Sequence, residues 1–341
     1  MRPGQGSSPA RPEGSGGTRV DRSSRNPSPW DCRAATRKII RSCPGATAGV
    51  TAARVTDAAA CRAARRFAPL PFGKIAYVER GSGDAALFLH GAPLNGFQWR
   101  GAFDRLCDVR RCIAPDFMGL GSSEVPESQS LAAADQVDML AALLDSLGVS
   151  QVDIVASDSG GAVAQLFLVR FPRRVRTLLL TNCDTEPNSP PPKVMPAIEL
   201  ARAGTLAAST AEWLTDPAMA RSTFGAAVFQ DPNTLTQEVI ETYASPVVSS
   251  PKRQAQYHAF HKALLPNPLE GIETKLRRTH VPVRIVWGES DDFFSSEDAH
   301  YLDRMFPGSQ GIRFVPGGKL FFQEENPDII AEEALRLWKV H

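Results

Sequence analysis

The sequence of 341 residues has no uninterrupted apolar run of about 18 residues, the length that a membrane-spanning helix needs. It also has no Gly-x-Gly-x-x-Gly motif after a predicted strand and no phosphate-binding loop. Its six cysteines form neither a Cys-x-x-Cys pair nor a Cys/His metal spacing, and scattered thiols are typical of a reducing cytoplasm. We therefore expect a cytoplasmic protein with no membrane span, no cofactor and no metal.

Charge is distributed unevenly along the chain. Residues 1–66 carry 13 Lys and Arg against four Asp and Glu, whereas the remainder carries 25 against 33. The first 66 residues are rich in Arg, Pro, Gly and Ser and poor in large apolar residues, so we predict a disordered extension there. An Arg-rich, acid-poor composition is also found in transit peptides, although a non-conserved tail is the simpler interpretation. The acidic remainder excludes a nucleic-acid partner and leaves a small-molecule substrate as the expected one.

From residue 72 onward, strand and helix patterns alternate. Strands are predicted at residues 74–78, 85–90, 112–116, 152–156, 175–181, 283–287 and 312–315, and helices at 131–147, 159–170 and 327–338. Such alternation predicts an α/β fold with a mostly parallel, doubly wound sheet. Residues 187–268 contain helical stretches but no buried strand. We therefore predict a core at 67–186 and 269–341, interrupted by a helical cap at 187–268 that lies between two strands.

A sharp turn joins the strand at 152–156 to the next helix. The turn reads Ser157-Asp158-Ser159-Gly160-Gly161, which is the pattern of a nucleophile elbow. The tip of such a turn needs small neighbours two positions before it and two and three after it. Both Asp158 and Ser159 meet this requirement. The register of the strand favours Asp158, because it places Val155 three positions before the tip.

Three motifs together resemble the α/β-hydrolases, specifically the branch with an aspartate nucleophile that includes haloalkane dehalogenases and epoxide hydrolases. They are His90-Gly91-Ala92-Pro93, Ala114-Pro115-Asp116-Phe117-Met118-Gly119-Leu120-Gly121, and the elbow. The resemblance extends over nearly all of residues 70–340. It implies an α/β-hydrolase fold with a cap inserted between strands.

The resemblance also implies roles for individual residues. Asp158 matches the nucleophile, which forms an ester with a carbon of the substrate. The backbone N–H groups of Ala92 and Ser159 match the oxyanion hole. Asp291 matches the acid that orients a histidine, with Asp184 as the second choice. Ser159 remains the alternative nucleophile, but a hydroxyl needs an adjacent base, whereas a free carboxylate is ionised at neutral pH.

The family's catalytic histidine is missing. It follows a Pro-Gly-x-Gly segment in the family, and the corresponding position here is Leu320. His258 and His261 lie three residues apart in the predicted cap and share one face of a helix that could look into the pocket. We expect His90 to be structural and His280, His300 and His341 to lie at the surface.

The substrate class stays open between epoxides, haloalkanes and esters. The family's usual halide donors have no counterpart at Ser159 or Ala92, and Trp213 is the only tryptophan in the cap. Epoxide hydrolases use cap tyrosines, for which Tyr243 and Tyr257 are the candidates. The first hypothesis is a hydrolase that works through an ester on Asp158. The alternative is a protein that binds a ligand, or reacts once, because the histidine is absent.

Overall fold

The structure, a computed structural model, describes residues 57–339. An eight-stranded sheet forms its centre, in the order β1-β2-β4-β3-β5-β6-β7-β8. The strands are β1 (Arg65–Leu70), β2 (Gly73–Arg80), β3 (Ala85–Leu89), β4 (Arg111–Pro115), β5 (Val152–Asp158), β6 (Val175–Cys183), β7 (Val283–Gly288) and β8 (Ser309–Val315). β1 and β2 are antiparallel to their neighbours, and all other pairs are parallel.

Burial on both faces explains the continuous apolar run of β3. Every residue of β3 and of β5 is buried. Parallel strands of this kind are covered by helices on both faces, so their side chains are apolar in both directions. The carboxyl ends of β3, β5 and β6 lie side by side, and ligands of such sheets bind at this edge.

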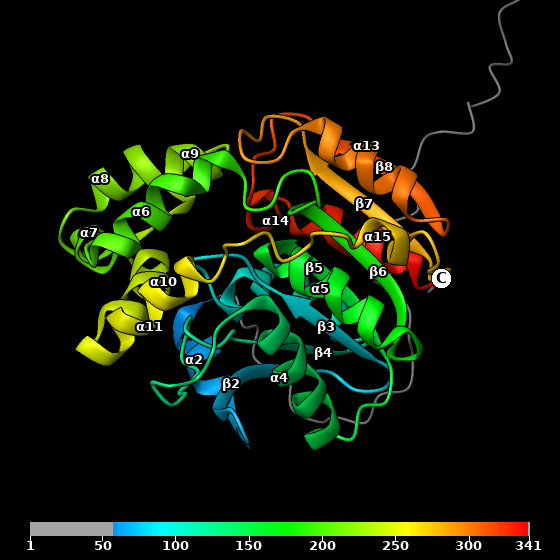
Figure 1. Cartoon of the computed structure of the whole chain (residues 1–341), viewed down its shortest axis with the longest axis horizontal. Helices are drawn as coiled ribbons and strands as arrows, with labels where there is room; N and C mark the ends of the chain where they lie inside the picture. Colours follow the sequence, from blue (N-terminus) through cyan, green and yellow to red (C-terminus); the bar gives the residue numbers. More distant parts are fainter. Residues whose placement is uncertain (1–56, 340–341) are drawn as a thin grey trace, which may run out of the picture. The chain divides into compact units, whose positions relative to one another are not determined.

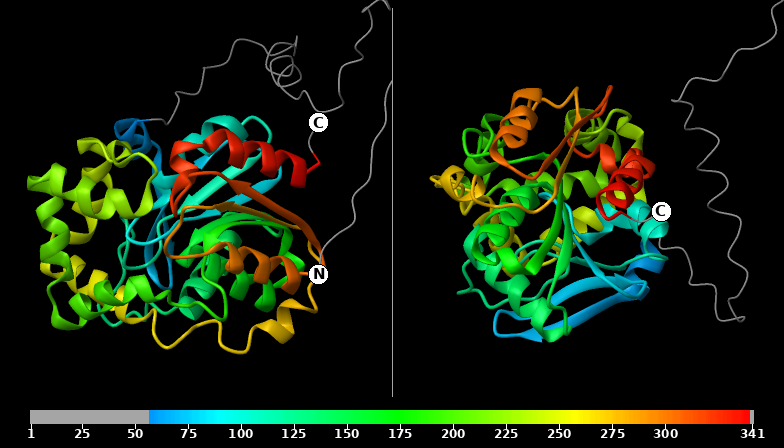
Figure 2. Two further views of the ribbon diagram at one scale, coloured as in Figure 1. Left: turned by 90° about the horizontal axis from the view of Figure 1, so that it is seen from above. Right: turned by 90° about the vertical axis from the view of Figure 1, so that its right-hand side faces the viewer.

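Helices cover both faces of the sheet. α3 and α15 pack together on one face and α4 and α5 on the other, as Figure 2 shows. The helices outside residues 192–262 are α2 (Ala58–Ala64), η1 (Gly96–Trp99), α3 (Arg100–Leu106), α4 (Ala133–Ser146), α5 (Ser159–Arg170), η2 (Pro172–Arg174), α12 (Glu273–Leu276), α13 (Ser296–Met305), α14 (Phe322–Glu325) and α15 (Pro327–Leu337).

A helical insertion separates β6 from β7. Its helices gather at one end of the sheet (Figure 1), beyond the carboxyl ends of the strands. They are η3 (Pro192–Val194), α6 (Met195–Ala203), α7 (Leu206–Thr215), α8 (Pro217–Ala220), η4 (Arg221–Gly225), α9 (Ala226–Val228), η5 (Pro232–Thr234), α10 (Gln237–Val248) and α11 (Pro251–Lys262). We refer to residues Pro192–Lys262 as the insertion.

The predicted fold class is confirmed, and each predicted strand is present within a few residues of its expected bounds. The prediction of disorder is wrong for residues 57–66, which form α2 and the start of β1. Their ordering comes from distant partners: β1 pairs with β2, and Glu238 of α10 accepts a hydrogen bond from the N–H of Ala58. Residues 1–56, the rest of the predicted extension, lie outside the described residues.

Candidate active site

Asp158 occupies the tip of the turn between β5 and α5. It is the last residue of β5, with φ 54° and ψ −134°, and Ser159 is the first residue of α5. Positive φ is uncommon for a residue with a side chain and costs roughly 1–3 kcal/mol. Such strain persists only where the surroundings impose it. The two candidates for the tip are therefore placed differently, with Asp158 at the apex and Ser159 in the helix.

The small residues after the tip are required by close packing. A Cβ atom at Gly160 would lie 2.6 Å from the carbonyl oxygen of His90, and one at Gly161 would lie 2.3 Å from the Cβ of Cys183. Both distances are shorter than atoms can approach without displacement. The glycines therefore let α5 begin directly against the ends of β3 and β6.

The Asp158 carboxyl group is bound by backbone donors. The N–H of Ala92 donates to its Oδ2 at 2.7 Å, and the N–H of Ser159 also interacts with the carboxyl group. These are the two donors that the resemblance assigns to an oxyanion hole. The N–H of Ala92 stabilises negative charge on Oδ2, and the N–H of Ser159 stabilises charge on the carboxyl group as a whole.

Burial opposes ionisation of this carboxyl group. Burial, followed by the nearby charge of Asp184, raises the pKa of Asp158 to about 7, while the backbone hydrogen bonds from Ala92 and Ser159 lower it. The expectation that this carboxylate is fully ionised at neutral pH is therefore wrong. The side chain is only 6% exposed, so water cannot compensate for the charge.

A cavity of about 190 Å³ lies between Asp158 and the insertion. The core contributes Ala92, Asp158, Ser159, Asp184, Phe293 and Leu320, among others. The insertion contributes mostly apolar and aromatic side chains, among them Leu206, Trp213, Phe224, Val228, Tyr257 and His261. A small, largely apolar pocket with a few polar groups is typical of a ligand site.

Leu320 lines this cavity and is 3% exposed. Its loop is held beside the loop of Asp291, because the N–H of Ser290 donates to the carbonyl of Gly318 at 2.9 Å. The position that the resemblance assigns to the catalytic histidine thus faces the cavity as an isobutyl group. This side chain has no titratable proton and no charge.

Asp291 lies behind this loop and is not among the residues that line the cavity. Its Oδ1 accepts from the N–H of Phe293 at 3.0 Å, and its Oδ2 accepts from Asn182 Nδ2 at 2.8 Å and from the N–H of Phe294 at 3.3 Å. Burial is the main cause that raises its pKa to about 7. No hydrogen bond joins Asp291 to a histidine within residues 57–339.

Asp184, the second-choice acid, does line the cavity. It directly follows β6, is 5% exposed, and its Oδ1 accepts from Ser189 Oγ at 2.7 Å. Burial raises its pKa to about 6, and the hydrogen bond from Ser189 lowers it. Asp292, the residue after Asp291, has a side chain that is 68% exposed and pairs with Lys193.

Two of the four insertion candidates lie at the cavity. Tyr257 and His261 both line it from α11. The Nδ1 of His261 lies 3.0 Å from the carbonyl oxygen of Tyr257 and must carry the proton, since a carbonyl oxygen only accepts. Its Nε2 is therefore the unprotonated nitrogen, and nothing within residues 57–339 donates a hydrogen bond to it. Burial lowers the pKa of His261 to about 4.

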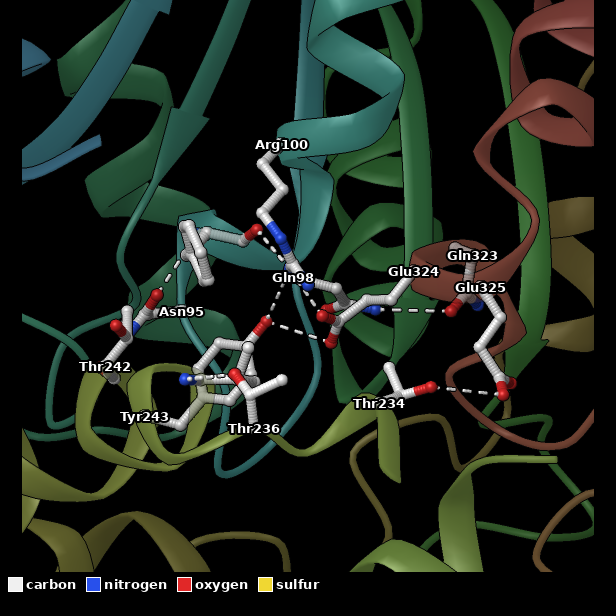
Figure 3. Close-up of polar contacts among 12 residues, drawn as sticks. Asn95, Gln98, Arg100, Thr234, Thr236, Thr242, Tyr243, Gln323, Glu324 and Glu325 are labelled. Atoms are coloured by element: carbon white, nitrogen blue, oxygen red, sulfur yellow. Dashed lines mark hydrogen bonds and ion pairs between the residues drawn. The ribbon is translucent and has the colours of Figure 1, made fainter. Parts of the chain in front are cut away.

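The other two candidates do not line the cavity. His258 turns away and its Nε2 accepts from the N–H of Ala207 at 3.0 Å. Tyr243 donates to Glu324 at 2.9 Å, and both contact Arg100, as Figure 3 shows. This buried cluster ties α10 of the insertion to α3 and α14 of the core. Helical spacing placed the His258 and His261 side chains on a common face, but only one of them points inward.

The tryptophans and the remaining histidines take structural places. Trp213 lines the cavity and stacks on Phe224, with ring centroids 4.8 Å apart. Trp287 is buried and its Nε1 donates to the carbonyl of Phe294. His90 is fully buried; its Nε2 accepts from the N–H of Phe117. His280 and His300 are exposed, and His341 lies outside the described residues.

Sequence reasoning missed three amides that hold the site in place. Asn182 of β6 binds both Asp291 and the main chain of Gly288. Gln98 accepts from the N–H of Gly91, and Gln323 donates to Ser157 Oγ and to the carbonyl of Leu320. Figure 3 shows Gln98 and Gln323 side by side. No motif in the sequence marks them, because the contacts of an amide side chain depend on how the folded chain brings its segments together.

Neither a metal-binding cluster nor a membrane-spanning helix is present among residues 57–339. They contain no group of three or more His, Cys, Asp or Glu side chains arranged to hold a metal ion. No helix in this part of the chain is both long enough and apolar enough to cross a bilayer.

Comparison with known proteins now assigns the class. A model of the alpha/beta hydrolase fold family matches residues 85–326, which is most of the chain. The protein therefore belongs to the alpha/beta hydrolase fold family. A crystal structure of an alpha/beta hydrolase fold protein from Burkholderia ambifaria superposes with a TM-score of 0.69 at 24% identity, over 80% of this chain and 97% of that one. At this identity the likeness concerns the fold.

Curated relatives match over shorter stretches. A cis-3-alkyl-4-alkyloxetan-2-one decarboxylase of Shewanella oneidensis is 32% identical over 121 residues, which are 35% of this chain and 38% of that protein. A haloalkane dehalogenase of Mesorhizobium japonicum is 40% identical over 108 residues, 31% of this chain and 35% of that protein. The matched stretches span only about a third of the relatives' length. Their activities are therefore not transferred to this chain by similarity.

Proposed function

We propose that the protein is a hydrolase that attacks a small electrophile through Asp158 and forms a covalent ester. The observation that carries the proposal is the placement of Asp158: it sits at the apex of a strained turn, lines an apolar cavity, and has its Oδ2 bound by the N–H of Ala92. A carboxylate held in this way is oriented for attack without further movement.

In the first step, Oδ1 of ionised Asp158 bonds to a carbon of the substrate, and the bond between that carbon and its leaving group breaks. The leaving group takes the bonding electrons, as halide, alkoxide or carboxylate. The N–H of Ala92 holds Oδ2 throughout, and the N–H of Ser159 stabilises the carboxyl group. This step consumes the anion of Asp158 and requires no base.

In the second step, water attacks the carbonyl carbon of the ester and a base takes a proton from that water. The bond between this carbon and Oδ1 then breaks, Oδ1 leaves with the substrate carbon as an alcohol that takes the proton from the base, and the oxygen of the water completes the regenerated Asp158 carboxyl group. The family's histidine is replaced by Leu320, so the base must come from elsewhere. His261 is our candidate, because its Nε2 is unprotonated, faces no donor in residues 57–339, and belongs to a cavity-lining side chain. Its lowered pKa makes it a weak base, so slow release is expected.

The substrate class follows from the cavity. Its small volume and apolar lining favour a compact molecule whose reactive carbon is bonded to a halogen, an epoxide oxygen or an ester oxygen. One relative is named a haloalkane dehalogenase and another acts on an oxetan-2-one, a strained cyclic ester. We propose Tyr257 as the proton donor for a departing oxygen. Its hydroxyl group forms a hydrogen bond with Thr210 at 3.2 Å. We also propose that the substrate is a small molecule and that the protein is cytoplasmic.

A second candidate is a protein that reacts once or only binds its ligand. Leu320 favours it, because an apolar side chain at this position activates no water. In this case the ester on Asp158 accumulates, or none forms.

Incubation with a panel of epoxides, haloalkanes and activated esters, followed by product analysis and intact-protein mass, tests the proposal. We expect either turnover or a stable mass increase with at least one class, and loss of both in Asp158→Asn. The matched control is Ser159→Ala, which keeps the backbone donor and removes only the hydroxyl. If Asp158→Asn retains the reaction and Ser159→Ala loses it, the role given to Asp158 is wrong.

A further inference from the structure

Besides Ser159, Lys193, Thr210 and Tyr257, three polar side chains that line the cavity supply hydrogen-bond acceptors. Asp158 and Asp184 contribute carboxyl oxygens, and His261 contributes its unprotonated Nε2. All three side chains are more than nine-tenths buried. The Nε2 of His261, and the Oδ2 of Asp184, receive no hydrogen bond from another residue within 57–339. Both side chains line the cavity, so a ligand that brings hydrogen-bond donors can satisfy these acceptors.

The two carboxyl groups also lack a positive partner. No Lys or Arg is among the charges that act on Asp158 or Asp184. Among the described residues that line the cavity, the one cationic side chain is Lys193, and its Nζ already lies 2.9 Å from Asp292 Oδ2 at a largely exposed site. At the position of the family's histidine, Leu320 supplies no charge either.

Aromatic side chains form part of the remaining wall. Trp213 and Phe224 stack on each other, and Tyr257 and Phe293 line the same cavity. The faces of aromatic rings attract cations, and rings grouped with carboxylates are a recurrent way to bind organic ammonium ions. This observation is independent of the carboxyl groups.

We propose that the cavity binds a small organic cation, specifically a compact apolar molecule that carries a protonated amine. Its N–H groups donate to Asp184, its charge offsets the two carboxyl groups, and its apolar part contacts the aromatic wall. Binding of such amines stands independently of the proposed function. Their role as the substrate class of the reaction at Asp158 rests on that function.

A cationic substrate would also activate its own nucleophile. A positive charge beside Asp158 favours the ionised carboxylate, which is the form that attacks. In relatives with the histidine, an imidazolium could supply this charge, whereas here the substrate supplies it. Binding is therefore coupled to proton release from the carboxyl groups at pH values near 6 to 7.

The experiment compares three probes of similar shape and different charge: benzylammonium, benzyl alcohol and benzoate. Calorimetric titration of the full chain at about pH 8 should show benzylammonium binding at least about tenfold more tightly than benzyl alcohol, with benzoate weakest. At about pH 6, titration in two buffers of different ionisation enthalpy should show proton release on binding of benzylammonium.

Asp184→Asn should reduce the affinity for benzylammonium about tenfold and leave that for benzyl alcohol unchanged. Its oxygen can still accept from Ser189, so the local structure is retained. The matched control is Asp138→Asn, which removes a carboxylate from an ion pair with Arg170 at the surface and should leave all three affinities unchanged. The probe series on the unaltered protein carries the test even if Asp184→Asn does not fold.

Equal affinity for benzylammonium and benzyl alcohol would overturn the inference, as would a preference for the cation that Asp184→Asn does not reduce. The outcome is separable from that of the proposed function. An ester on Asp158 formed only with neutral electrophiles, without a preference for the cation, removes this inference alone. Selective cation binding with no ester from any electrophile removes the proposed function alone.

Discussion

The cavity has two sides that depart from the family to different degrees. The side that we propose to attack the substrate, called the attack side, consists of Asp158 at the tip of its turn, with the N–H groups of Ala92 and Ser159 interacting with its carboxyl group. The release side consists of Asp291 and the loop that carries Leu320. Its acid is in position and held by three hydrogen bonds, but the histidine that the acid would orient is absent.

Under the proposed function, the difference separates formation of the ester, whose groups are present, from its hydrolysis, whose histidine position holds Leu320. Formation of the ester needs a positioned anion, whereas its hydrolysis needs a base. Leu320 also affects the attack side indirectly, since no cation next to Asp158 counteracts its burial. This accounts for a nucleophile whose pKa lies near neutrality.

The largest expected effect comes from restoring the release side. Leu320→His places an imidazole beside the cavity, in front of Asp291, and general base catalysis typically contributes about 10²–10⁴-fold. We expect hydrolysis of the Asp158 ester to accelerate by that factor, measured as the decay of the mass increase after excess electrophile is removed. Leu320→Asn, polar but not basic, is the control. Equal rates in both variants would mean that the position does not limit release.

A smaller effect is expected from removing the substitute base. His261→Gln should slow the residual hydrolysis of the ester about 10–100-fold and leave its formation unchanged. His258→Gln is the matched control, because it lies on the same helix and its side chain bonds to the main chain of Ala207 outside the cavity. Single-turnover mass spectrometry separates the two steps. If both variants behave like the unaltered protein, the base lies elsewhere.

The pH dependence sharpens the comparison on the attack side. The pKa of Asp158 is raised to about 7 and only the ionised form attacks, so the rate of ester formation should rise about tenfold per pH unit below 7 and level off above it. Rates of mass increase between about pH 5 and 9 test this. In Leu320→His, an imidazolium near Asp158 should shift the profile to lower pH. A flat profile would contradict the account of burial.

The smallest effect concerns stability. Burial raises the pKa of Asp184 to about 6, so the folded protein holds a proton that the unfolded chain loses above about pH 4. The free energy of unfolding therefore falls as pH rises from about 4 to 6 and stays lower above that. The free energy of unfolding of the Asp184→Asn variant should exceed that of the unaltered protein by about 1–2 kcal/mol at pH 8 and by little at pH 4, measured by denaturant titration. Asp138→Asn, at an exposed ion pair, should change stability by less than about 1 kcal/mol at either pH.

Much of the fold could be predicted from local patterns. A continuous apolar run identified β3, because a strand buried on both faces leaves a strong signal. The turn after β5 was visible because its steric demands act on neighbouring residues. The ordered segment 57–66 was missed, because its stability comes from β2 and from Glu238, far away in sequence. Composition of a window contains no information about such partners.

The site was less predictable, for related reasons. The absence of a histidine at Leu320 is readable from a motif, but the choice between His258 and His261 depends on how α11 is rotated against the core. Tyr243 could not be separated from Tyr257, because its partners Arg100 and Glu324 lie on distant segments. The raised pKa of Asp158 depends on burial by the insertion and on Asp184, so an unperturbed reference value was misleading.

Peptide-level mass spectrometry of the full chain, quenched during reaction with a reactive epoxide or haloalkane, tests the central claim most directly. The account predicts a covalent mass increase located on the side chain of Asp158, which persists longer in His261→Gln and is released quickly in Leu320→His. A mass increase located on Ser159 or another side chain, or product formation with no modified peptide at any time in His261→Gln, would contradict it.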